Sequence, residues 1–230
     1  MKELPLRERK YAATKAALLD AVLARLKDQT LESISVKEVC HEVQVSETTF
    51  FNYFASKEAV IFYFVQIWSI TVRWEMQQTL AQGGDHLDAI CALFELTAEQ
   101  SVRTPGVMGE IVAWQTRKRD AVIFPPLTRA EYALHFPDKT DIEQLQAQGI
   151  DQLLGAQLQA ALQAGELPAD SDLPALALAL MAIFFVTPIL LQQGPDADVK
   201  NAYRRQLQLV GMPECGPLKD PTRAAAHHHE

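Results

Sequence analysis

Residues 31–60 read LESISVKEVCHEVQVSETTFFNYFASKEAV, and this stretch decides the fold. It predicts two short helices joined by a tight turn and followed at once by a third helix. Ser35, Ser46 and Ser56 are the expected N-caps, because serine accepts a hydrogen bond from the free backbone N–H groups of a first helical turn. Glu38 stands three residues after Ser35, which gives a capping-box pattern. The spacing is that of a helix-turn-helix, whose second helix lies in the DNA major groove.

The second half of this stretch resembles the signature of the tetracycline-repressor (TetR) family of transcriptional regulators. That signature usually reads Gly-Val-Ser, two variable residues, Thr-Leu-Tyr-x-Tyr-Phe, two more variable residues, and Lys-Glu. Motif-level resemblance covers about residues 7–62, and the remainder matches the family in length and helical character. The matching residues are Val45-Ser46, then Thr49-Phe50-Phe51-Asn52-Tyr53-Phe54, then Lys57-Glu58.

Two positions depart from the signature. Gln44 replaces the usual turn glycine, so a residue with a side chain must adopt a positive φ at some cost in strain. Phe51 replaces a tyrosine that commonly donates its hydroxyl group to DNA, so that hydrogen bond is missing. The motif survives both changes.

The resemblance and the helical patterning imply an all-α protein of about nine helices. The expected domains are a helix-turn-helix head at 1–55, a helical ligand-binding and dimerisation domain at 56–211, and a tail at 212–230. The final AAAHHHE of the tail is either native or the remnant of an affinity tag. Residues 121–140 are predicted to be a loop with at most short helices. The other predicted helices cover 7–28, 56–81, 85–101, a run through Trp114 to Asp120, 150–164, 173–191 and 197–210.

The expected DNA contacts follow from position, because a recognition helix presents its N-terminal residues to base edges and uses its neighbours to hold phosphates. Glu47, Thr49 and Asn52 are the expected base-reading residues. Lys57, with the backbone amides at its helix start, is the expected phosphate clamp. Glu47 has a second interpretation, as a carboxylate that only stabilises the N-terminus of its helix. The predicted DNA-binding residues are Ser35, Lys37, Ser46, Glu47, Thr48, Thr49, Phe51, Asn52, Tyr53 and Lys57.

The effector site can be predicted only as a region. By resemblance, the helices of the body surround a ligand cavity, and such pockets are mostly apolar with a few placed polar groups. Ordinary core packing explains each candidate residue equally well. The predicted ligand-binding residues are Trp68, Trp74, Met76, Phe94, Met108, Trp114 and Arg117.

Charge is distributed unevenly along the chain. The formal net charge is −8, yet residues 1–60 contain nine basic and nine acidic residues and are neutral. Within residues 1–27, seven basic residues stand against three acidic ones. A basic N-terminal segment on an acidic body suits a DNA-binding head, since neutralisation of phosphates supplies most non-specific affinity.

The three cysteines and the histidines give no metal or catalytic pattern. Cys40, Cys91 and Cys215 are widely spaced and form no CxxC, so we expect neither a disulfide framework nor a zinc site, as suits a reducing cytoplasm. There is no HExxH, no Glu-x-x-His pair and no phosphate-binding glycine loop. The sequence therefore predicts no enzyme, no cofactor and no metal.

Residues 173–191, LPALALALMAIFFVTPILL, form the main competing signal, because they lack charge and are long enough to span a membrane. Acidic residues flank the run on both sides, without the usual asymmetry of Lys and Arg. Pro188 is expected to kink or stop the helix near its end. A helix that is apolar all round also fits the core of a bundle, and we prefer that interpretation.

These features predict a cytoplasmic, homodimeric transcriptional regulator, most often a repressor in this family. It would bind a palindromic double-stranded DNA operator and leave it when an unknown small-molecule effector binds. Dimerisation is expected through about 141–164 and 172–193, as a four-helix bundle across a two-fold axis. The long helix at 56–81 is the expected lever between the two domains. The alternatives are a membrane-anchored helical protein that uses 173–191, and a TetR-like fold without DNA binding.

Overall fold

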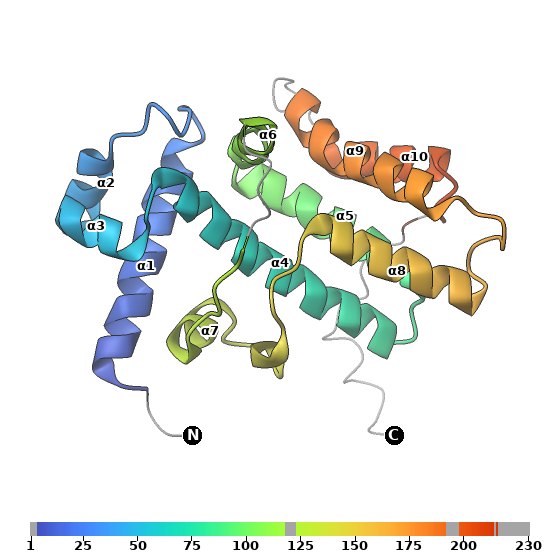
Figure 1. Cartoon of the computed structure of the whole chain (residues 1–230), viewed down its shortest axis with the longest axis horizontal. Coiled ribbons are helices and arrows are strands. Elements are labelled where there is room, and N and C mark those ends of the chain that lie inside the picture. The colour runs from blue at the N-terminus through green and yellow to red at the C-terminus, as the bar shows by residue number, and fades with distance from the viewer. Residues whose placement is uncertain (1–3, 118–122, 192–197, 214, 216–230) are drawn as a thin grey trace, which may run out of the picture.

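The computed structural model describes residues 4–117, 123–191, 198–213 and 215. Every regular element in this part of the chain is a helix, which confirms the all-α prediction. Figure 1 shows α1 to α3 at one end of the molecule, with the long α4 running from them into the body. The helices are α1 (Leu6–Arg25), α2 (Val36–Val43), α3 (Glu47–Tyr53), α4 (Lys57–Ala81), α5 (His86–Arg103), α6 (Val107–Arg117), α7 (Arg129–His135), a 3-10 turn η1 (Ile142–Gln144), α8 (Ile150–Ala164), α9 (Leu173–Leu191) and α10 (Val199–Leu209).

The helix-turn-helix forms from the caps that the sequence predicts. Ser35 and Ser46 each accept a hydrogen bond from the backbone N–H of the third residue of the helix that follows. Gln44 ends α2 with φ 59° and ψ 44°, so this non-glycine residue does adopt the left-handed conformation. The capping box at α2 is only half formed: Ser35 accepts from the Glu38 N–H, but among the described contacts the exposed Glu38 carboxylate returns no hydrogen bond.

Two hydrophobic cores meet along α4. The first contains buried residues of α1, α2, α3 and the N-terminal part of α4, together with residues of α7 and η1. The second joins the C-terminal part of α4 to α5, α8, α9 and α10. The change falls between Ile70, which belongs to the first core, and Val72, which belongs to the second. The core of the head therefore continues past residue 55 into α4 and α7, and shared apolar packing fixes the head to the body.

The remaining helix ends follow local signals, with one correction. Asp85 and Thr128 begin α5 and α7 with complete capping boxes, and α7 is the short helix allowed within 121–140. The described part of α6 ends at Arg117, and the predicted extension to Asp120 lies outside the described residues. Pro188 does not stop α9, which continues to Leu191. A proline near the C-terminus of a helix removes only one late hydrogen bond, so the helix tolerates it there.

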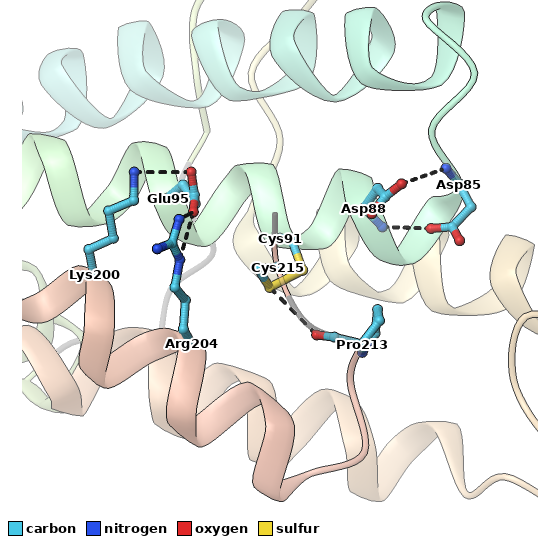
Figure 2. Close-up of a disulfide and its surroundings, with 8 residues drawn as sticks. All are labelled: Asp85, Asp88, Cys91, Glu95, Lys200, Arg204, Pro213 and Cys215. Carbon is cyan, nitrogen blue, oxygen red and sulfur yellow. Dashed lines mark hydrogen bonds and ion pairs between the residues drawn. A yellow bond between two sulfur atoms is a disulfide. The ribbon is translucent and has the colours of Figure 1, made fainter. Parts of the chain in front are cut away.

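The structure contradicts the prediction that no cysteines are paired. Cys91 on α5 and Cys215 beyond α10 form a disulfide with 5.4 Å between their Cα atoms (Figure 2). The bond ties the start of the tail to α5, and Met212 is buried beside it. Sequence spacing gave no signal, because 124 residues separate the two cysteines. Cys40 is a buried free thiol.

α9 keeps the apolar character that made 173–191 a candidate membrane span. Among the described helices it alone is long and apolar enough to cross a bilayer, with a mean hydropathy of 2.4. Only 22% of its apolar window is buried within the chain. One side packs on α10, where the Tyr203 hydroxyl donates to the Phe184 carbonyl over 2.7 Å. The exposed apolar side chains lie on another side and include Leu178, Val186 and Leu190.

Candidate nucleic-acid interface and ligand cavity

α3 presents an exposed face of three polar residues and one phenylalanine to the outside of the head. Phe50 anchors the opposite side of the helix, because its side chain is 0% exposed within the core. Thr49 is partly buried, and its hydroxyl lies 2.8 Å from the Ser46 hydroxyl, so it supports the helix cap. The residues that α3 exposes on neighbouring positions of one face are Glu47, Thr48, Phe51 and Asn52.

Basic residues flank this face. The rings of Tyr11 and Tyr53 pack against each other at a tilt of 36° with their centroids 4.5 Å apart, which places the start of α1 beside the end of α3. Exposed basic residues occupy the turn of α1 around Tyr11, and Lys37 is exposed at the start of α2. The basic residues of that turn of α1 are Arg7, Arg9 and Lys10.

Lys57 has a structural role that its position in the motif did not predict. Its ammonium group donates to the carbonyl of Glu32 over 2.6 Å and to that of Ile34 over 3.1 Å. These bonds hold the segment that leads into α2 against the start of α4. An ammonium group has three donors, so these two bonds leave Lys57 one further donor.

The body contains a cavity of about 890 Å³. Its described walls come from α4, α5, α6, α9 and the segments 123–127 and 143–152, with Tyr132 of α7. Aromatic side chains dominate the apolar part: the rings of Phe62 and Trp114 meet at 4.4 Å between centroids, and Trp68 packs on Phe184 at 5.6 Å. The volume and apolar lining are those of a site for a drug-sized ligand.

The structure brings together some of the residues predicted to bind a ligand. Trp68, Met108 and Trp114 line the cavity. Met76 and Phe94 instead lie in the second hydrophobic core. The remaining two predicted residues are outside the described lining: Trp74, whose indole N–H donates to the Thr140 carbonyl, and Arg117, which is exposed.

Sequence reasoning missed the polar residues of the cavity wall. Gln66, Thr97, Gln100 and Ser101 all line it. Thr97 and Ser101 are four residues apart on α5 and therefore share one helix face. Polar residues that share one face of the otherwise apolar α5 were the signal by which the sequence could have indicated this part of the wall.

α6 connects the cavity to the head. Its N-terminal turn lies against the end of α1, where a Cβ atom on Gly106 would come within 2.3 Å of the Leu26 carbonyl oxygen. The Glu110 carboxylate accepts a hydrogen bond from the Leu31 backbone N–H over 2.9 Å. The same helix lines the cavity with Met108, so it touches both regions.

α7 makes a second connection through a buried ion pair. Lys15 of α1 lies 2.7 Å from Glu131, whose side chain is 2% exposed. The Lys15 ammonium also lies 3.9 Å from the centroid of the Tyr63 ring. The next residue along α7, Tyr132, lines the cavity. A displacement of α7 therefore changes contacts of both the cavity and α1.

Burial sets the protonation states of this cluster. Burial alone raises the pKa of Glu131, but hydrogen bonds from Lys15 and Thr128 outweigh it, and the net pKa is lowered. Burial lowers the pKa of His135, an effect that the Glu131 carboxylate partly offsets. Burial raises the pKa of Tyr63, and Glu131 raises it further. Near pH 7 the Tyr63 hydroxyl is therefore protonated and the His135 imidazole neutral, and the hydroxyl oxygen lies 2.9 Å from His135 Nε2 in a hydrogen bond whose donor is set by the His135 tautomer.

No protein-family model matches the chain, and no curated protein sequence matches it. Solved structures do. FadR of Thermus thermophilus, described as a TetR-family transcriptional repressor in complex with lauroyl-CoA, matches with 20% identity and a TM-score of 0.55, over 85% of this chain and 92% of its own. FadR of Bacillus halodurans, a fatty acid degradation regulator, matches with 14% identity and a TM-score of 0.59, over 85% and 96%.

A third matching structure is described as the molecular basis for control of antibiotic production by a bacterial hormone. It is 23% identical, with a TM-score of 0.60, and the match covers 86% of this chain and 95% of that one. The shared architecture spans the head and the body alike. The chain has the fold of the TetR-family transcriptional regulators.

Proposed function

We propose that this chain is a DNA-binding transcriptional regulator whose affinity for an operator is controlled by a small molecule in the body cavity. The observation that carries the proposal is a physical connection. α6 and α7 each contribute to the wall of the cavity and each contact the helix-turn-helix head, through Glu110 and Glu131. A ligand that displaces either helix therefore acts on the position of the head.

The exposed face of α3 is the proposed base-reading surface. Asn52 has the amide group that pairs with adenine, and Thr48 has a methyl group that fits the thymine methyl. Glu47 either accepts a hydrogen bond from cytosine or only stabilises its helix. Lys37, the basic turn of α1 and the third donor of Lys57 surround this face with phosphate-binding groups. Thr49 is a weaker candidate than its position in the motif implies, because its hydroxyl is engaged by Ser46.

Two copies of the chain form the proposed DNA-binding unit. The exposed positions of α9 recur every three or four residues and make one apolar stripe, in which small alanines allow close approach of a second helix. A second copy is the occupant that fits, because a stripe that packs on itself is self-complementary across a two-fold axis. Of the predicted interface, residues 192 and 193 lie outside the described residues. The exposed members of the stripe are Ala175, Leu178, Ala182, Val186 and Leu190.

The membrane alternative receives no support from the packing of α9. Its inner side is held by α10, an amphipathic helix whose Lys200 and Arg204 pair with Glu95 of α5 (Figure 2). A helix with this charged neighbour is not surrounded by lipid on that side. Cytoplasmic location and the absence of catalytic activity are parts of this proposal.

The proposed mechanism is a shift between two arrangements of the heads. In a dimer, the two α3 helices must be about 34 Å apart to enter successive major grooves. Operator DNA binds the arrangement in which the heads have this spacing. The effector binds best to the arrangement in which α6 and α7 hold the heads at a different spacing. The two ligands then exclude one another. α4 is no longer the only candidate lever, since α6 and α7 also contact both regions.

The test is a selection of random duplex DNA on purified protein. Enrichment of a palindrome that is bound by two chains supports the proposal. A soluble dimer that enriches no sequence, even after denaturation and refolding to remove any bound effector, favours the same fold without DNA binding.

A further inference from the structure

We propose that the cavity takes an uncharged, largely apolar molecule that carries hydroxyl or amide N–H donors, and that it rejects carboxylates, phosphates and acyl-CoA thioesters. This inference rests on the proposed function only in treating the cavity as the effector site. The argument comes from three properties of the described wall: its aromatic surface, the direction of its hydrogen bonds, and the sign of its charges.

The apolar part of the wall fits a ring system. Phe62, Trp68 and Trp114 line the cavity on α4 and α6, and Phe184 and Phe185 line it on α9. Aromatic side chains favour offset or edge-to-face contacts with other rings. A cavity of about 890 Å³ with such walls has room for a molecule of several fused rings.

The hydroxyl groups of the wall have already used their protons. Thr97 Oγ1 donates to the Leu93 carbonyl over 2.7 Å, and Ser101 Oγ donates to the Thr97 carbonyl over 2.7 Å. A hydroxyl has one proton and two lone pairs. Both groups therefore offer the ligand an acceptor, and they offer no donor unless a helix bond is broken.

The amide groups of the wall are oriented in the same sense. Gln66 donates its side-chain N–H to the Pro125 carbonyl, and Gln100 donates its side-chain N–H to Thr104 Oγ1 over 3.2 Å. Each of these bonds uses one of the two N–H donors of its amide group, so each glutamine keeps its Oε1 acceptor and one N–H donor. Tyr132 also donates its hydroxyl proton, to the Leu145 carbonyl over 2.7 Å. A ligand that donates hydrogen bonds satisfies the hydroxyl oxygens of this wall, whose protons are already used within the protein.

The charges of the wall oppose an anion. Glu143 and Asp151 line the cavity and are exposed, which places two carboxylates where it meets solvent. Among the described lining residues there is no Lys, Arg or His, and residues 118–122, between the lining residues Gln115 and Ile123, lie outside the described part of the chain. An anionic ligand would thus lose its hydration and meet acceptors and negative charge in exchange, which is strongly unfavourable.

This chemistry separates the chain from one structure that shares its fold. The FadR of Thermus thermophilus is described in complex with lauroyl-CoA, and a CoA thioester carries several phosphate charges. A site for that ligand needs cations to bind the phosphates. The described lining of this chain supplies none, so the proposal assigns this cavity a ligand without phosphates.

The test compares three fluorescent probes that share one ring system: 1-pyrenebutanol, 1-pyrenebutyrate and 1-butylpyrene. Binding is read from energy transfer between Trp68 or Trp114 and pyrene, with purified protein and no DNA. We expect the alcohol to bind at least ten-fold tighter than the carboxylate and roughly three- to ten-fold tighter than the hydrocarbon, the value of one or two hydrogen bonds. Equal binding of alcohol and carboxylate, preference for the carboxylate, or binding of none of the three overturns the inference.

Variants locate the effect. Thr97→Val and Ser101→Ala each remove an acceptor. Each should therefore weaken binding of 1-pyrenebutanol by roughly three-fold or more and leave the affinity for 1-butylpyrene unchanged. The double variant Glu143→Gln/Asp151→Asn should reduce the difference in affinity between 1-pyrenebutanol and 1-pyrenebutyrate. Thr79→Val is the matched control, because Thr79 also donates to a helix carbonyl but lies outside the cavity lining. Loss of both alcohol and hydrocarbon binding in Thr97→Val and Ser101→Ala would contradict the acceptor role.

The outcome is independent of the proposed function. If the protein selects a palindrome but prefers the anionic probe, the regulator proposal stands and the ligand class is wrong. If it prefers the alcohol but selects no DNA, the ligand class stands and the regulator proposal fails.

Discussion

The ion pair between Lys15 and Glu131 should couple the head to the body by a measurable free energy. Its members lie 2.7 Å apart, with side chains 14% and 2% exposed, so water screens the pair only weakly. Breaking a buried pair from one side costs about 3–5 kcal/mol. Because Lys15 is slightly exposed, this cost is at the lower end, and we expect Lys15→Met or Glu131→Gln to lower the unfolding free energy by about 3 kcal/mol. Glu131→Gln keeps an oxygen to accept from Thr128, so the helix cap survives.

The assay is a double-mutant cycle from urea unfolding at pH 7 and low salt. Because the double variant leaves no buried charge unpaired, it should be less destabilised than the sum of the two single changes, by about 2 kcal/mol. Arg25 and Glu42 supply the matched control: they also form an ion pair at 2.7 Å, but Glu42 is 54% exposed. Arg25→Met/Glu42→Gln should show a coupling below about 1 kcal/mol.

The reasoning would be refuted by additivity. If the Lys15 and Glu131 changes add to within about 0.5 kcal/mol, or if their coupling equals that of the control pair, then the pair does not tie α1 to α7. The connection between cavity and head would then depend on α6 alone.

Three further predictions follow from single contacts. Cys215→Ser should lower the melting temperature of the oxidised protein and remove its sensitivity to reductant, because a disulfide across so long a loop stabilises by about 2–4 kcal/mol; scanning with and without dithiothreitol checks this. Gly106→Ala should destabilise by more than 1 kcal/mol in urea unfolding, since the new Cβ would meet the Leu26 carbonyl oxygen at 2.3 Å and φ is +88°; Gly109→Ala, with open space around its Cβ, is the control. The unfolding free energy should fall as pH drops below about 6.5, by at most about 1.4 kcal/mol per pH unit, because His135 binds a proton in the unfolded chain at a pH where the buried, folded His135 stays neutral. His135→Gln should make the unfolding free energy less dependent on pH between pH 7 and pH 5.

The parts of the fold that local chemistry determines were predictable from the sequence. The serine caps and the left-handed Gln44 each depend on a few neighbouring residues, and the structure confirms them. Short-range signals of this kind survive in a single sequence because no distant partner is needed.

Features that depend on distant contacts were not predictable. Cys215 reaches Cys91 only because α10 folds back along α5. Lys15 reads as one of several basic residues of the N-terminal segment, and only the docking of α7 shows that it is a buried partner of Glu131. The cavity wall likewise depends on which helix faces meet, which explains why Trp68 lines the cavity and Phe94 lies in the core.

The most direct measurement of the central claim is a fluorescence-anisotropy titration of the selected duplex at two salt concentrations. The proteins compared are the wild type, the double variant Thr48→Ala/Asn52→Ala, and the control Gln77→Ala. Gln77 is exposed and lies on the C-terminal part of α4, in the body. The account predicts salt-dependent binding by the wild type and by Gln77→Ala, and a loss of at least ten-fold in the double variant with a nearly unchanged salt slope. Equal affinity of all three proteins for the duplex would contradict it, because the exposed face of α3 would then not read DNA.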